Sequence, residues 1–302
     1  LDVPLLTADA SDTAGYIAIA QTPWPGSLAV LQSASGTGYA RAGTAVASAV
    51  VGRTMQAVPW GPHSRFEYAT AIDVQISAGQ LVSVPERDLL DGANALALQT
   101  GDGAWEVVQF ASAELTGPRR YTLSNLLRGQ AGSDAERLPV VPAGARVVLL
   151  DQRLVHLDLT GDDLNRPLQW RVTKVGAGVA GSQVKQTEHG FVGRGRRPLS
   201  PVHIRGTRNA GGIDLTWIRR TRRNGDNWEQ AEVPLGEDVE AYEVDILDGG
   251  SVVRTLSAAV PLVRYAAADV VADFGALDAP VKVRVHQMSA AAGRGSPAEA
   301  TV

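Results

Sequence analysis

The stretch Val281-Lys282-Val283-Arg284-Val285-His286-Gln287-Met288 alternates apolar and polar side chains over eight residues. Successive side chains of a β-strand point to opposite faces of its sheet, so this period of two predicts a strand with one buried face. A glycine-rich hairpin, Gly293-Arg294-Gly295-Ser296-Pro297, follows it and leads to a last short strand at residues 300–302. The end of the chain is therefore predicted to be antiparallel sheet.

Four more strands are predicted between residue 200 and this segment, because the same alternation recurs between glycines and prolines. They are Pro201–Gly206, Gly212–Ile218, Glu240–Leu247 and Val252–Leu256. In the second of these strands, one face is predicted to bury Ile213, Leu215 and Trp217. In the third, Tyr242, Val244 and Ile246 are predicted to point inward, and Glu243 and Asp245 outward.

The same alternation of apolar and polar side chains occurs in the first 175 residues. Their predicted strands are Tyr16–Ile19, Ser27–Leu31, Phe66–Ile76, Ala95–Gln99, Trp105–Phe110, Arg146–Leu150, Leu154–Leu159 and Leu168–Val172. Thr100–Gly103 is predicted to close a hairpin, and the only helical candidates are short, at Ala40–Gly52 and Glu86–Asp91. Closely spaced strands without intervening helices indicate antiparallel sheets, as sandwiches or partly closed barrels. The predicted fold class is all-β.

Residues 176–199 differ in composition from the rest, since they hold few apolar side chains able to anchor a core. We interpret them as a linker or exposed excursion between a β-rich domain at 1–175, which can hold two subdomains, and a second domain at 200–302. Arg194, Arg196 and Arg197 lie in this segment. A solvated linker and a contact with phosphate or an acidic surface are both compatible with them.

Bulk composition excludes several classes of protein. The 302 residues are 44% hydrophobic, carry a formal net charge of -4 and contain no cysteine. Disulfide frameworks, thiolate nucleophiles and cysteine zinc sites are therefore ruled out, and the net charge gives no indication of a nucleic-acid partner. No window has the roughly 20 apolar residues of a membrane span, and no signal segment is present. Because the chain begins at Leu1, we expect it to be part of a longer polypeptide.

Residues 200–302 resemble a fibronectin type III domain. The resemblance rests on Trp217 in the second predicted strand, Tyr242 in the third, and a long penultimate strand before a Gly-Ser-Pro turn. It implies a β-sandwich, and such domains usually act as spacers or binding modules. The complete expectation is one or more sandwich or partly closed barrel domains followed by a fibronectin type III-like sandwich.

Two further segments resemble phage tail-tip proteins. Tyr121–Asp134, which contains Leu126-Leu127-Arg128-Gly129, is similar to their "LLRG-x-x-G" segment. The stretch from Trp217 through Gly225-Asp226-Asn227-Trp228 to Val233-Pro234-Leu235-Gly236-Glu237 is similar to the large tail protein of gene transfer agents and siphophage-like particles. Leu1–Leu6 is similar to the start of another block of that family.

This resemblance implies a baseplate or tail-tip component, called the host-specificity or megatron protein. It implies a homotrimer around the tail axis that contacts the tail hub, the distal tail proteins and a cell-surface glycan or receptor. Such a protein is made in the bacterial cytoplasm, belongs to the tail of the particle and is extracellular after release. The family's TIM-barrel-like portion lies upstream and is missing from this chain.

Six residues are candidates for interactions. Arg128 is predicted either to form an ion pair that fixes its own loop or to contact a neighbouring subunit. Arg219, Arg220, Arg222 and Arg223 precede Trp228 in a loop that also holds Glu229, Glu232, Glu237, Asp238 and Glu240. These opposite charges either neutralise each other or, with Trp228, present a patch for acidic envelope glycans.

No catalytic residue, cofactor or metal site is predicted. The five histidines are not at metal-ligand spacing, and no nucleophile elbow or P-loop is present. The acidic pair Asp162-Asp163 lacks the rest of an EF-hand loop and is interpreted as a solvated turn.

Two alternatives remain open. One is the sugar-binding part of a secreted carbohydrate-active protein, with Trp24, Trp60, Trp105, Trp170 and Trp228 as stacking platforms. The other is a hydrolase domain within residues 1–190.

Overall fold

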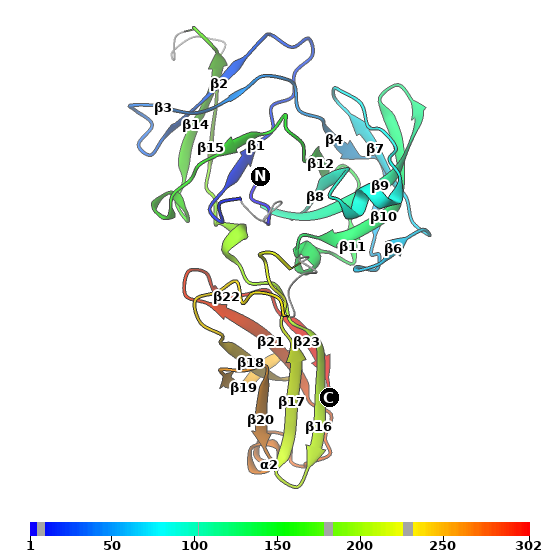
Figure 1. Cartoon of the computed structure of the whole chain (residues 1–302), viewed down its shortest axis with the longest axis vertical. Helices are drawn as coiled ribbons and strands as arrows, with labels where there is room; N and C mark the ends of the chain where they lie inside the picture. The colour runs from blue at the N-terminus through cyan, green and yellow to red at the C-terminus, as the bar shows by residue number, and fades with distance from the viewer. Residues whose placement is uncertain (5–9, 102, 178–183, 226–231) are drawn as a thin grey trace. The chain divides into compact units, whose positions relative to one another are not determined.

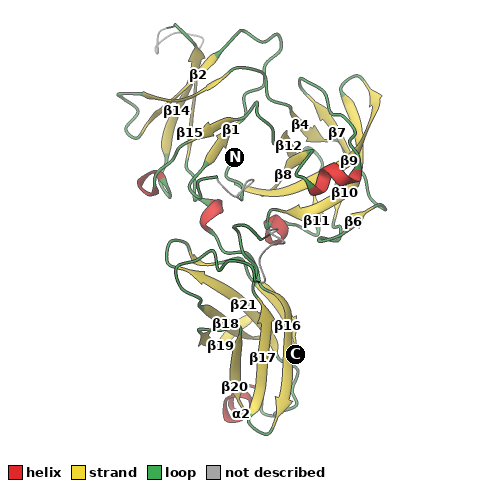
Figure 2. Ribbon diagram, viewed as in Figure 1, coloured by secondary structure: helices red, strands yellow, loops and turns green. Residues whose placement is uncertain are grey.

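The computed structural model describes residues 1–4, 10–101, 103–177, 184–225 and 232–302. The chain divides into two compact units, Leu1–Gly195 and Arg196–Val302 (Figure 1). Strands dominate both units, and the described α-helices are the short α1 (Glu86–Leu90) and α2 (Ala267–Phe274) (Figure 2). The predicted all-β class is confirmed. Neither of these helices has the length and apolar character needed to cross a bilayer.

The first unit contains a closed antiparallel barrel. Its strands, in hydrogen-bonded order, are β10 (Arg120–Gln130), β7 (Ile72–Ile76), β4 (Val51–Thr54), β12 (Arg146–Leu149), β8 (Ala95–Gly101) and β9 (Ala104–Gly117). Because β9 also pairs with β10, the sheet closes on itself and these strands have no free edge. Inside the barrel lie fully buried side chains such as Val74, Leu98, Phe110, Leu123 and Leu126.

The segment predicted as one strand at Phe66–Ile76 forms two. β6 (Phe66–Glu67) and β7 both pair with β10, since Glu67 lies opposite Leu126 and Ile72 opposite Leu123. The break between them has a local cause. The Glu67 carboxylate accepts hydrogen bonds from the backbone N–H groups of Ala69 and Thr70, at 2.7 and 3.2 Å, which turns the chain out of the sheet. A separate two-stranded ribbon is formed by β5 (Val58–Pro59) and β11 (Val140–Val141).

A second sheet completes the first unit. Its order is β15 (Lys185–His189), β14 (Leu168–Lys174), β2 (Leu28–Ser33) and β3 (Ala40–Ala45), and a separate pair is formed by β1 (Gly15–Ile17) and β13 (Val155–Leu157). Their shared core includes Val30, Leu157, Leu168, Trp170 and Phe191.

The helix predicted at Ala40–Gly52 is wrong, because this segment forms β3 and the start of β4. Its alanines favour a helix, but two close approaches require an extended backbone with glycine. A Cβ added at Gly43 would lie 2.4 Å from the Val155 side chain, and one at Gly52 would lie 2.5 Å from the Gln75 carbonyl oxygen. Tertiary packing therefore overrides local propensity. The other helical candidate, Glu86–Asp91, is confirmed as α1.

Residues 176–199 were predicted to be a linker or an exposed excursion, and a linker is wrong over the described residues up to Gly195. Lys185–His189 forms β15, and Phe191 packs into the core at 2% exposure. The chain then returns to its beginning: the Asp2 carboxylate accepts the backbone N–H groups of Val192, Gly193 and Arg194 at 2.6, 3.0 and 2.8 Å. Composition missed this because β15 has five exposed side chains and is held by its backbone ladder.

The second unit is a sandwich of two antiparallel sheets. One is β16 (Val202–Asn209), β17 (Gly212–Ile218) and β20 (Leu262–Ala266); the other is β19 (Ser251–Ala258), β18 (Tyr242–Asp248), β21 (Lys282–Ser289) and β23 (Ala298–Thr301). β22 (Gly293–Arg294) also pairs with β21. This two-sheet arrangement is fibronectin type III-like, as predicted. Trp217 and Tyr242 meet edge to face in the core, with ring centroids 5.1 Å apart.

The outward position predicted for Asp245 is only partly right. Its side chain leaves the core face, but it is 1% exposed because Arg294 from the neighbouring hairpin covers it. Arg294 donates two hydrogen bonds to this carboxylate, at 2.7 and 3.0 Å, and Thr255 donates a third at 2.7 Å. Burial by itself would raise the pKa of Asp245, but these hydrogen bonds outweigh it and hold the pKa below its ordinary value.

Candidate functional site

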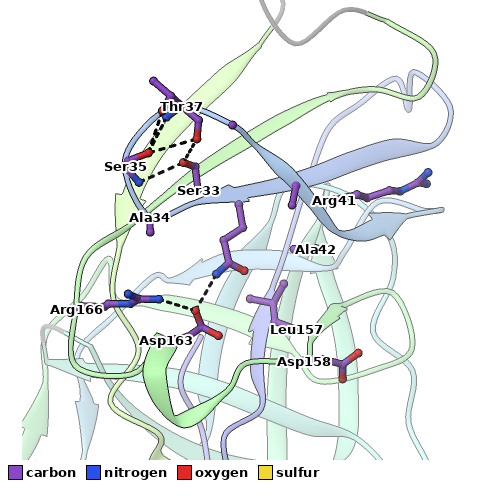
Figure 3. Close-up of a pocket in the computed structure, with 13 residues that line it drawn as sticks. Ser33, Ala34, Ser35, Thr37, Arg41, Ala42, Leu157, Asp158, Asp163 and Arg166 are labelled. Atoms are coloured by element: carbon purple, nitrogen blue, oxygen red, sulfur yellow. Dashed lines mark hydrogen bonds and ion pairs between the residues drawn. The ribbon is translucent and has the colours of Figure 1, made fainter.

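A polar pocket in the first unit is the candidate functional site. It has a volume of about 540 Å³ and is lined by the β2–β3 hairpin, from Gln32 to Ala42, and by the segment from Leu157 to Arg166 (Figure 3). These two segments are more than a hundred residues apart in the sequence. They meet because β2 and β13 contribute to the same core, with Val30 and Leu157 both fully buried.

The Asp163 carboxylate organises one side of this pocket. Its Oδ1 accepts hydrogen bonds from Gln32 Nε2 at 3.3 Å and Arg166 Nη2 at 3.0 Å. Its Oδ2 accepts the backbone N–H and the hydroxyl of Thr160, at 2.9 and 2.7 Å, which forms a capping box around the 3₁₀ turn Gly161–Asp163. Figure 3 shows the Arg166 guanidinium directed at Asp163.

These hydrogen bonds also fix the charge of Asp163. Partial burial would raise its pKa, but the bonds from Thr160 and Arg166 more than offset that effect, and the pKa lies below its ordinary value. Asp163 is therefore an ionised group that holds Gln32 and Arg166 in place.

Hydroxyl groups, the exposed Asp158 carboxylate and Arg41 form the rest of the polar lining. Ser33 donates to the Thr37 carbonyl oxygen, and the Ser35 and Thr37 hydroxyls lie 3.0 Å apart. The Asp158 side chain is 95% exposed, and its carboxylate lies 3.2 Å from His156 Nδ1. Ala34 and Ala42 add apolar surface to the lining, and the fully buried Leu157 lies behind it.

The sequence did not predict this pocket. Its one available signal was the acidic pair Asp162-Asp163, which we interpreted as a solvated turn. Asp162 is exposed as expected, but Asp163 lies in the pocket wall. Over the described residues, no three His, Asp or Glu side chains gather closely enough to hold a metal ion.

Arg128 lies in a second polar cluster, at the barrel. Its guanidinium donates from Nε and Nη2 to the two carboxylate oxygens of Glu106, at 2.7 Å each, and the two side chains are 1% and 0% exposed. Glu106 also accepts the backbone N–H of Gly129 at 3.1 Å, and Arg128 Nη1 donates to the Pro59 carbonyl oxygen at 3.2 Å. Of the two predicted roles, this geometry matches the ion pair that fixes a loop. So little exposed surface leaves Arg128 nothing to offer a neighbouring subunit.

The described arginines of the β17–β18 loop bind backbone and acids of the second unit, most of them within the loop itself. Arg219 donates to the carbonyl oxygens of Pro234 and Val233 at 2.9 and 2.8 Å, and Arg220 donates to that of Ser200 at 2.6 Å.

The next two arginines continue this loop. Arg222 pairs with Glu237 at 2.7 Å, with side chains 9% and 4% exposed, while the Arg223 backbone N–H donates to the Thr221 hydroxyl at 3.2 Å. Trp228, the remaining candidate, lies outside the described residues, and a glycan role for this loop stays a prediction.

The tryptophans proposed as stacking platforms occupy different environments. Trp105 and Trp170 are core residues, 9% and 2% exposed, and Trp24 packs against the core of the second sheet. Trp60 is 54% exposed, but the Arg137 guanidinium lies over its ring, 5.1 Å from the centroid. Of these four described tryptophans, Trp60 is the one with a largely exposed ring, and the Arg137 guanidinium occupies one of its faces.

Comparison with known proteins gives one match within the sequence. The family described as Rcc01698-like, C-terminal, matches residues 49–148, about a third of the chain. A search of curated proteins finds no match.

Two solved structures are similar over longer stretches. Domains d3–d4 of the rat CD45 extracellular region are 12% identical, with a TM-score of 0.25 and coverage of 44% of this chain and 62% of that one. The FN1–FN3 domains of chicken CNTN1 are 9% identical, with a TM-score of 0.25 and coverage of 92% and 88%. The present chain thus spans under two thirds of the CD45 fragment.

The family match coincides with the barrel. It begins two residues before β4 and ends within β12, and so includes the Arg128–Glu106 pair. Residues 49–148 are thus similar to the C-terminal domain of Rcc01698-like proteins.

Proposed function

We propose that this chain is a structural and adhesive component of a phage-like tail tip, which helps to assemble the particle and contacts the recipient cell surface. The observation that carries the proposal is the similarity of Tyr121–Asp134 to the tail-tip "LLRG" segment. In the fold, this segment is β10 and the turn after it, and Arg128 and Gly129 both bind Glu106.

The physical character of the two units supports a mechanical role. A barrel without free edges does not add strands from neighbouring copies, so it is suited to crowded packing in an assembly. The second unit is a fibronectin type III-like sandwich, a fold used widely as a spacer or binding module. The polar pocket of the first unit provides a place for contact with a small ligand.

Immunogold electron microscopy tests the location. Antibodies raised against the purified chain are applied to particles released by the bacterium that encodes it, with serum pre-absorbed on the chain as the control. We expect gold at the distal end of the tail. Gold on the capsid, along the whole tail, or in no excess over the control contradicts the proposal.

Sedimentation velocity tests the assembly state separately. We propose that the chain forms a homotrimer, at least at high concentration, because the tail-tip resemblance implies three copies around the tail axis. A mass of three chains supports this. A single-chain mass across the whole accessible concentration range contradicts trimerisation through these residues.

A further inference from the structure

We propose that the pocket between the β2–β3 hairpin and the Leu157–Arg166 segment binds a neutral sugar, as part of an envelope polysaccharide. The inference deepens the proposed function, on which its biological meaning rests, by naming the ligand class and the place of contact. It uses none of the arginines of the β17–β18 loop.

The chemical variety of the lining is the first argument. A sugar presents neighbouring hydroxyl groups that each donate and accept hydrogen bonds, next to weakly polar C–H faces. The pocket offers an exposed acceptor in Asp158, donors in Arg166, an amide in Gln32 and hydroxyls in Ser35 and Thr37. Ala34 and Ala42 supply apolar surface for the C–H groups. Its volume of about 540 Å³ is within the range of small-molecule sites.

Pre-organisation is the second argument. Asp163 accepts bonds from Gln32, Arg166 and Thr160, so the amide and the guanidinium are held in place before a ligand arrives. Asp163 takes one hydrogen bond of the Arg166 guanidinium, and over the described part of the chain its other N–H groups are available as donors. Side chains that are already ordered lose less entropy on binding.

Charge balance selects a neutral ligand. Arg41 and Arg166 line the pocket together with Asp158 and Asp163, so the formal charges of the lining cancel. For a phosphate or a highly acidic sugar, repulsion from Asp158 and Asp163 offsets attraction to Arg41 and Arg166, so the lining gives an anion no net advantage. The hydroxyl groups of a neutral sugar can donate hydrogen bonds to the carboxylates and accept them from the guanidinium groups.

Saturation-transfer difference NMR on the whole chain tests the inference. The probes are the methyl glycosides of glucose, galactose, mannose, rhamnose and N-acetylglucosamine, each at millimolar concentration, with inorganic phosphate as a competitor. We expect transfer to at least one glycoside, unaffected by phosphate. Absence of transfer to all five, or displacement of the glycoside by phosphate at equal concentration, overturns the proposal.

Variants locate the binding. Ala40 is an exposed pocket residue, so Ala40→Trp places an indole in the opening, and Asp158→Asn removes the exposed charge. Each is expected to weaken binding at least tenfold. The matched controls are Ala143→Trp, on an exposed residue outside the pocket lining, and Asp162→Asn, on the exposed neighbour of Asp163. Equal binding by Ala40→Trp and Ala143→Trp overturns the assignment.

Asp163→Asn tests the organising role, and thermal unfolding identifies any variant that fails to fold. Ala40→Trp and Asp158→Asn touch no hydrogen bond of the Asp163 network, so they keep the proposal testable if Asp163→Asn unfolds. Sugar binding without gold at the tail end would leave this inference standing and refute the proposed function. Gold at the tail end without sugar binding would support the proposed function and refute this inference.

Discussion

Replacing Arg128 by methionine is predicted to destabilise the barrel strongly. Methionine keeps much of the length of the side chain but removes the charge. Glu106, which is 0% exposed, then loses both of its 2.7 Å hydrogen bonds from the guanidinium. The Gly129 N–H, at 3.1 Å, is the remaining described donor to that carboxylate. A buried carboxylate cannot regain in the interior the hydration that it gave up on folding.

The expected magnitude follows from this loss of a partner. Breaking a buried ion pair on one side lowers the free energy of unfolding by about 3–5 kcal/mol. Since each 1.4 kcal/mol is about tenfold in an equilibrium constant, opening of the barrel should become roughly a hundred to several thousand times more frequent. The double variant Arg128→Met/Glu106→Leu leaves neither charge unpaired, so it should recover most of the loss.

Hydrogen exchange of the whole chain, read by mass spectrometry, measures this effect for each unit separately. Peptides from β9 and β10 report opening of the barrel, and peptides from β17 and β21 in the other compact unit provide an internal control. The exposed pair Arg264–Asp214 provides a second control, because its bidentate geometry is similar but the Arg264 side chain is 58% exposed. Arg264→Met should therefore have a much smaller effect on its own unit.

Two results would refute this reasoning. One is a loss of less than about 1 kcal/mol in Arg128→Met, the upper range for an exposed pair. The other is a double variant as unstable as the sum of its single variants, since that would mean that Arg128 and Glu106 stabilise the barrel independently.

Three further predictions concern other parts of the chain. Gly212→Ala should lower the free energy of unfolding of the second unit by more than about 1 kcal/mol, because Gly212 has φ +129° and a Cβ there would lie 2.1 Å from the Tyr265 carbonyl oxygen; an unchanged thermal midpoint would contradict this. Asp2→Ala leaves the N–H groups of Val192, Gly193 and Arg194 without their acceptor, and each buried unsatisfied group costs about 1–3 kcal/mol of folding free energy. Limited proteolysis should therefore cut residues 184–195 faster in this variant than in the unaltered chain. The lowered pKa of Asp245 predicts a contribution to stability that is complete above its ordinary pKa of 3.8 and is lost as the pH falls through the folded-state pKa; Asp245→Asn should lack this part of the acid dependence in denaturant titrations, and an identical acid profile would refute it.

Alternation predicted much of the strand pattern, and also the buried faces that contain Trp217 and Tyr242. In the first unit it missed β10 and β15, besides the strands β3 and β4 that were predicted as helix. In the second unit it missed two neighbouring elements, β20 and α2. Leu262–Ala266 is only five residues long and contains Arg264, so its period is weak. The helix Ala267–Phe274 has no side-chain cap at its start, and so lacks a sequence signal for its beginning.

Glu106 shows why the polar clusters were not predicted. It lies within the apolar run Trp105–Phe110, where alternation treats a single acid as a solvent-facing position. Its partner is 22 residues away, and the two meet because β9 and β10 pair with a register shift between Leu127 and Gln130. A single sequence does not contain that register. The pocket is harder still to predict, because its two segments are more than a hundred residues apart and meet through a shared core and the Gln32–Asp163 hydrogen bond.

The Asp2 carboxylate also determines how the first unit would respond to pulling. It holds the start of the unit directly against Val192, Gly193 and Arg194, close to its end at Gly195. Tension applied between Leu1 and Gly195 would first load the three hydrogen bonds to Asp2. The hydrogen bonds between the barrel strands would be loaded only after these had broken. The unit would therefore yield at this junction before its strands separated, so that a longer polypeptide would lengthen there while the barrel stayed folded.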